Sequence, residues 1–79
     1  MSELPVAPFD RKLRAAGKGM RVSQRASVAL RDSVQRLAER IGERAGELAS
    51  ARGKRYVEKE DVQRAFLEVV LGLAAEEGR

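Results

Sequence analysis

The feature that most constrains this chain is a stretch of roughly 30 residues, Ser23 to Arg52, that contains no proline. Within it, apolar residues recur at spacings of 4, 3, 4 and 7, which places them within about 60° of one another on a helical wheel. They are Leu30, Val34, Leu37, Ile41 and Leu48. The pattern predicts one helix, about 45 Å long at 1.5 Å per residue, with an apolar seam along its length.

This seam needs a second long helix to cover it, and the sequence predicts only one. The chain has 79 residues and contains neither Cys nor His, so disulfides and zinc fingers cannot supply the stability that so small a domain needs. Oligomerisation is the remaining common source of stability. We therefore expect the chain to form a homodimer through the seam.

Proline and glycine separate a shorter helix from each end of the long one. The first is predicted from Pro8 to Ala16, ending at Gly17. Ser23 is the expected N-cap of the long helix, and Gly53 ends it. A basic loop follows, and a third helix is predicted to begin between residues 58 and 61. Ala, Leu, Arg and Glu dominate the composition while Thr and Asn are absent, so an all-α fold is predicted.

The third helix carries more apolar surface than one face can hold. Val62, Phe66, Val69 and Leu73 again step by 4, 3 and 4. A second apolar set follows Phe66 and comprises Leu67, Val70, Leu71 and Ala74. We expect this set to be buried at an oligomer contact. The chain is thus predicted to be one domain, 1–79, with a core at 4–66 and a C-terminal helical extension at 67–79.

Basic residues exceed acidic ones by 16 to 12, a formal net charge of +4. Residues 1–27 hold six basic and two acidic residues, and residues 51–64 hold five and three. The excess lies in the first helix and the two loops. Cationic side chains beside the free N–H groups of helix ends suit DNA phosphates. The alternative is that these charges only keep the surface soluble, and composition alone weights the two equally.

Catalysis is not predicted, because the serines have no recognisable base beside them. Glu39 and Glu43 lie one turn apart and could hold a divalent ion, but Arg36, Arg40 and Arg44 alternate with them. Solvated i,i+4 ion pairs are far more common than metal sites in such patterns. We therefore expect no enzyme, no metal site, no cofactor and no small-molecule substrate. Neither a membrane span nor a secretory signal is predicted, which favours a cytoplasmic protein.

The order short helix, loop, long helix, loop, short helix is typical of one family. Its opening carries Arg11 and Arg14 on the first helix, and several short segments match in order and spacing. These are Glu3-Leu4-Pro5-Val6-Ala7-Pro8, Ala16-Gly17, Arg21-Val22-Ser23, Gly53-Lys54-Arg55-Tyr56-Val57 and Glu60-Asp61-Val62. Over residues 3 to about 66 the chain resembles the archaeal histones, which have the histone fold.

The resemblance implies a handshake homodimer in which two long helices cross antiparallel. The first loop of one protomer then lies beside the second loop of the other. The predicted dimer interface comprises Leu30, Val34, Leu37, Ile41, Leu48, Val62 and Phe66. The resemblance also implies that Asp61 pairs with Lys54, at a position where the family usually has Arg.

In this family the paired loops and first helices contact DNA phosphates without reading base sequence. The residue matching Arg21 enters the minor groove. Carried over to this sequence, the predicted DNA-binding residues are Arg11, Arg14, Lys18, Arg21, Ser23, Lys54, Arg55 and Tyr56.

Two functions follow as hypotheses. The first is a chromosomal architectural protein, located at the nucleoid, that binds, bends or wraps duplex DNA with little sequence preference. The second is a histone-fold interaction module that bridges DNA or pairs with another subunit. The expected partners are double-stranded DNA and a second copy of the chain, in dimers or higher oligomers, and a histone paralogue is a further candidate.

Overall fold

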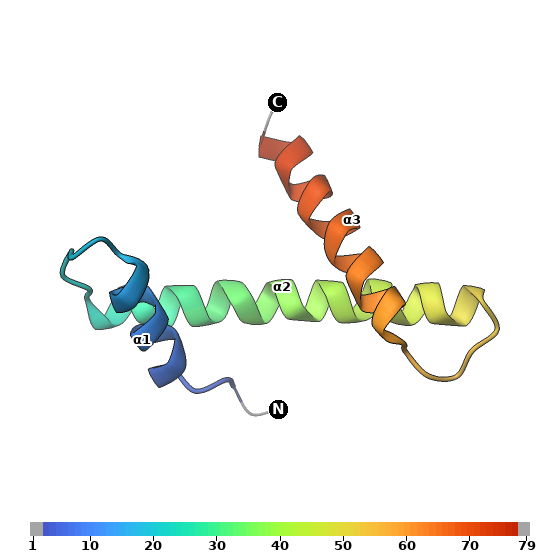
Figure 1. Ribbon diagram of the computed structural model, residues 1–79, viewed down its shortest axis with the longest axis horizontal. Helices are drawn as coiled ribbons and strands as arrows, with labels where there is room; N and C mark the ends of the chain where they lie inside the picture. Colours follow the sequence, from blue (N-terminus) through green and yellow to red (C-terminus); the bar gives the residue numbers. More distant parts are fainter. Residues whose placement is uncertain (1–2, 78–79) are drawn as a thin grey trace. The chain divides into compact units, whose positions relative to one another are not determined.

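The computed structural model describes residues 3–77, with side chains described from Glu3 to Leu73. Figure 1 shows three helices in this range and no strand: α1 (Ala7–Ala16), α2 (Gln24–Ala51) and α3 (Lys59–Glu77). The chain divides into two compact units, Met1–Arg36 and Leu37–Arg79. The first holds α1 and the start of α2, and the second holds the rest of α2 and α3. This helix order confirms the predicted all-α fold.

Local hydrogen bonds define both ends of α2. Ser23 Oγ accepts a hydrogen bond from the N–H of Ala26 at 3.1 Å, which is the predicted N-cap. At the other end the N–H of Lys54 donates to the carbonyl of Ala49 at 3.0 Å. Gly53 makes this reversal possible with φ of 75°, a left-handed conformation that favours glycine.

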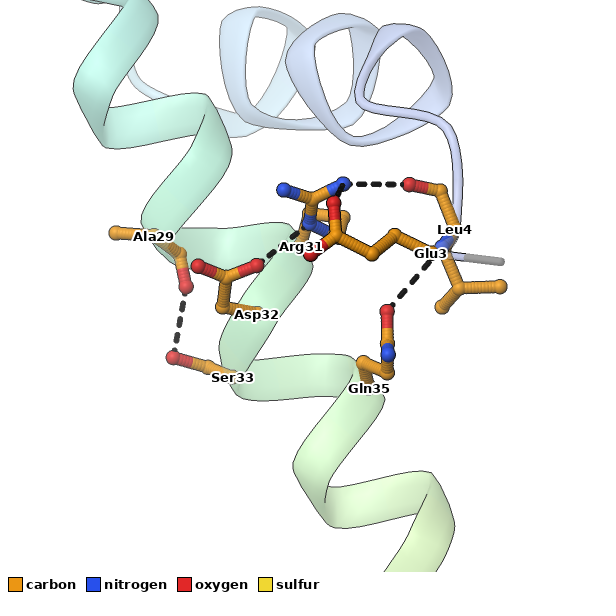
Figure 2. A network of polar contacts seen from close by, with 7 residues as sticks. All are labelled: Glu3, Leu4, Ala29, Arg31, Asp32, Ser33 and Gln35. Atoms are coloured by element: carbon orange, nitrogen blue, oxygen red, sulfur yellow. Dashed lines mark hydrogen bonds and ion pairs between the residues drawn. The ribbon is translucent and has the colours of Figure 1, made fainter. Parts of the chain in front are cut away.

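Polar contacts attach the N-terminal segment to α2 (Figure 2). Arg31, only 9% exposed, donates from Nη1 to the carbonyl of Leu4 at 2.7 Å. Its guanidinium also pairs with Asp32 at 2.6 Å and with Glu3 at 3.4 Å. The N–H of Leu4 donates to Gln35 Oε1 at 3.2 Å. The segment is therefore fixed by its own backbone groups and by one arginine.

Helix α1 is likewise held by polar groups, since it contains no buried residue. Ser27, 1% exposed on α2, donates from Oγ to Asp10 Oδ1 at 2.6 Å. Arg14 donates to the other oxygen of Asp10 at 2.8 Å. The hydrogen bonds from Arg14 and Ser27 hold the pKa of Asp10 below its ordinary value.

The hydrophobic core of the described chain consists of three alanines, Ala45, Ala49 and Ala65. The predicted seam residues of α2 are all half-buried, while Val62 and Phe66 of α3 are 45% and 47% exposed. Burial of large apolar side chains is the main favourable contribution to folding. The described residues thus leave most of that contribution to be made by a second chain.

The seam predicts that a charge within it removes the dimer and the fold together. Because small domains are stable by only about 5–15 kcal/mol, a carboxylate introduced by Leu37→Asp should abolish most helical circular dichroism and the dimer mass in sedimentation. Ala38→Asp is the matched control, since Ala38 is the exposed neighbour. A Leu37→Asp protein that remains a helical dimer contradicts the seam.

Candidate nucleic-acid interface

The first loop, residues 17–23, forms a tight turn anchored to α1. Lys18 and Gly19 both have positive φ, 56° and 75°, and the N–H of Met20 donates to the carbonyl of Gly17 at 3.1 Å. Arg14 Nη2 donates to the carbonyl of Val22 at 3.3 Å. The side chains of Lys18 and of Arg21 in the same loop are exposed. The loop therefore presents two cations on a backbone with a defined conformation.

The second loop, residues 52–58, is closed by a two-pronged ion pair. Arg52 donates from Nε and Nη2 to the two oxygens of Asp61 at 3.1 and 2.6 Å. Asp61, 3% exposed, also accepts a hydrogen bond from the N–H of Glu58 at 2.9 Å. This last contact caps the first turn of α3.

The pKa values of this pair follow from the contact. The hydrogen bond from Arg52, together with the N–H of Glu58, lowers the pKa of Asp61 below its ordinary value. The same hydrogen bond raises the pKa of Arg52. Both groups are therefore charged at neutral pH, and the loop is closed by opposite charges.

The predicted pairing of Asp61 with Lys54 is wrong, because Arg52 takes that place. Arg52 directly follows α2 and has the planar fork that matches both carboxylate oxygens, which an ammonium group cannot match. The turn at Gly53 carries Lys54 onward, and its Nζ lies 6.0 Å from the centre of the Tyr56 ring. The arginine directly after the last helical residue of α2 was the sequence signal for this contact.

Cations of the described chain fall into two groups. Arg14, Arg31, Arg44 and Arg52 make all the ion pairs found in this part of the chain. Within the same residues, the remaining predicted DNA-binding cations are exposed and make no ion pair. These are Arg11, Lys18, Arg21, Lys54 and Arg55. Acidic residues of the fold therefore do not neutralise the cations of the two loops.

The structure places the predicted site residues in two sets. Five lie in the first unit: Arg11, Arg14, Lys18, Arg21 and Ser23. Three lie in the second: Lys54, Arg55 and Tyr56. Ser23 is exposed but has its Oγ in the N-cap, and Arg14 is engaged with Asp10 and Val22. Tyr56 is 61% exposed. Sequence reasoning did not identify Arg31 or Arg52 as residues that fix backbone segments.

Sequence comparison identifies the family. The family described as "Histone-like transcription factor (CBF/NF-Y) and archaeal histone" matches residues 2–66. The chain belongs to this histone-fold family. It is also 43% identical over 65 residues to the archaeal histone HAN1 of Thermococcus zilligii, an alignment that covers 82% of this chain and 96% of that protein.

Membership explains the helix order and implies that this histone-fold chain dimerises. The family comprises structural DNA-binding proteins rather than enzymes. Among the described residues, no helix has the length and apolar content to cross a membrane. The family match ends at residue 66, whereas α3 continues to Glu77.

The clasp between Arg52 and Asp61 predicts acid sensitivity. A carboxyl whose pKa is lowered in the folded state contributes stability above its unfolded pKa and loses that contribution as the pH falls through the folded pKa. Asp61→Asn should therefore lower the thermal midpoint at pH 7 and weaken its dependence on pH below about 4, leaving the parts due to Asp10 and Glu68. Thermal unfolding from pH 2 to 7 measures both.

Glu60→Gln is the matched control, because Glu60 is exposed beside Asp61 and makes no ion pair among the described residues. Equal pH profiles for the parent and Asp61→Asn count against the clasp.

Proposed function

We propose that this chain is an architectural protein that binds double-stranded DNA without sequence preference and compacts, bends or wraps chromosomal DNA as a histone-fold dimer or higher oligomer. The observation that carries the proposal is the set of exposed, unpaired cations on two loops whose backbones are fixed by intramolecular contacts. Family membership and the similarity to an archaeal histone support it.

The mechanism is neutralisation of phosphates. Two copies, each with a net charge of +4, give a formal +8, and cations placed on phosphates release the counterions of the duplex. In the handshake dimer implied by the family, a first loop and a second loop come together from different protomers. The proposed contact residues are Arg11, Lys18, Arg21, Lys54, Arg55 and Tyr56, with Ser23 at the N-terminus of α2.

Two arginines act by positioning these contacts. Arg14 holds the carbonyl of Val22, and so fixes the backbone next to Arg21. Arg52 closes the loop that carries Lys54 and Arg55 through Asp61. Arg21 is the residue proposed to enter the minor groove, where deformability of the duplex rather than base contacts sets preference.

A second candidate function is that of an interaction module that bridges DNA or pairs with another subunit. The observation that favours it is the apolar surface of α3, where Leu67 and Leu71 are 58% and 66% exposed. In this case the loops contribute little binding. Gel shifts on unrelated duplexes distinguish the two functions, because the architectural protein shifts all of them at low salt and the module shifts none.

Replacing Arg21 tests the DNA interface. Since every dimer carries two copies, Arg21→Ala should lower the slope of log affinity against log salt by about 2 and weaken binding by about 10-fold at moderate salt. The loss should be similar on duplexes of unrelated sequence, because phosphate and minor-groove contacts carry little sequence information. Fluorescence anisotropy over a salt series measures both quantities.

Arg36→Ala is the control, because Arg36 is an exposed arginine of α2 outside both loops and makes no ion pair among the described residues. An Arg21→Ala protein that binds as tightly as the parent, with the same slope, shows that the groove role of Arg21 is wrong.

A further inference from the structure

The last part of α3 lies beyond the part of the chain that the family match covers. That match ends at residue 66, and the 65 residues aligned with the archaeal histone already cover 96% of that protein. Helix α3 continues to Glu77. We call residues 67–77 the α3 extension.

One side of α3 is fixed on α2, which determines where the extension points. Asp61 and Ala65 are 3% and 0% exposed, and Val69 is half-buried. Arg44 of α2 donates from Nε and Nη2 to the two carboxylate oxygens of Glu68 at 2.9 and 3.2 Å. The same arginine bonds Glu47 at 3.0 Å. The contact face of α3 thus reaches into the extension, which is held against α2 at Glu68.

Leu67 and Leu71 lie away from that contact face and also away from the dimer seam. They are 58% and 66% exposed. At 100° per residue, Leu71 lies about 140° from Phe66 and about 180° from Val62. One neighbouring helix covers an apolar stripe about 100° wide, so a partner that covers Val62 and Phe66 leaves Leu71 uncovered.

Val70 follows the seam more closely, since it lies about 40° from Phe66 and is 37% exposed. Ala74, the fourth residue predicted at an oligomer contact, lies outside the residues whose side chains the structure describes. The surface that needs a second neighbour is therefore the pair Leu67 and Leu71.

We propose that the α3 extension is a second self-association surface, through which Leu67 and Leu71 of one dimer pack antiparallel on the same residues of another dimer. This inference rests on the proposed dimer and goes beyond the DNA-binding function. It assigns the contact to a part of the chain that the family match does not include.

A second copy fits this surface because the surface adjoins the seam. Leu67 lines an apolar hollow of about 510 Å³ together with Ile41, Val62, Gln63 and Phe66, three of which belong to the predicted dimer interface. The exposed pair therefore begins at the edge of that interface, and both protomers of a symmetric dimer present it. A patch that pairs with itself about a two-fold axis closes without leaving a free copy.

The charges also favour a protein partner in antiparallel orientation. Residues 65–79 hold one basic and three acidic residues, a balance that repels DNA phosphates. Glu76 and Glu77 follow the leucines, and Arg64 precedes them. An antiparallel pairing brings the acidic end of one helix next to Arg64 of the other, whereas a parallel pairing brings like charges together.

The test uses the full chain with the double substitution Leu67→Ser and Leu71→Ser. Sedimentation equilibrium without DNA should show the parent in equilibrium between dimer and tetramer. The variant should stay a dimer, with the dimer–dimer dissociation constant raised by about 100-fold or more because two leucines are lost from each side. Its helical signal and thermal midpoint should match those of the parent. Ser33→Ala, at an exposed position of the first unit, is the control.

Three outcomes overturn the proposal: a parent that is a dimer at all concentrations, a variant that forms tetramers like the parent, or a variant that dissociates to monomers. The last would assign the leucines to the dimer seam. Gel shifts on the same proteins report the proposed function separately, because a tetramer that fails to shift DNA retains this contact and loses only that function.

A charge exchange tests the orientation. Arg64→Glu should weaken tetramer formation, and adding Glu76→Arg and Glu77→Arg to the same chain should restore it. Failure of the restored chain to form tetramers overturns the antiparallel arrangement.

Discussion

Apolar side chains that one copy cannot bury govern this protein. Its own core consists of Ala45, Ala49 and Ala65, which remove little apolar surface from water compared with leucine or phenylalanine. The larger residues of α2 and α3 stay at least partly accessible. Folding and association are therefore coupled, because the contribution that fixes the long helix is completed by a second chain. The polar contacts at the ends of the helices then determine the path of the backbone, not the overall stability.

Those polar contacts use arginine in a consistent way. Arg31, Arg44 and Arg52 each join segments that are distant in sequence, through two or more hydrogen bonds or ion pairs. A guanidinium can do this because its planar fork offers several donors at once. The cations of the two loops make no such contacts within the described residues and stay exposed. The same residue type therefore serves both the architecture and the proposed DNA surface.

The three helices could be predicted from the sequence because their signals are local. Apolar periodicity, Ser23 before α2 and Gly53 after it each act within a few residues, and the structure confirms all three. The partner of Asp61 could not be predicted in this way. It depends on where the chain goes after Gly53, and the resemblance indicated Lys54 where Arg52 makes the contact.

The candidate site was predictable in its residue types and less so in their roles. Exposed loop cations follow from charge and position alone, so Lys18, Arg21, Lys54 and Arg55 lie where the sequence placed them. Arg14 looked the same in sequence but is bonded to Asp10 and Val22. The attachment of Leu4 by Arg31 had no periodic signal, because it joins a backbone carbonyl to a side chain 27 residues away. Contacts of this kind require the folded chain.

The separation between the two groups of arginines has a consequence for isolation of the protein. Arg52 binds a carboxylate that is 3% exposed, and ions of the medium screen such short, partly buried contacts far less than exposed charges. Concentrated salt should therefore wash the protein from chromosome preparations while leaving its helices and its clasped second loop intact. The recovered material should rebind after dialysis without a refolding step.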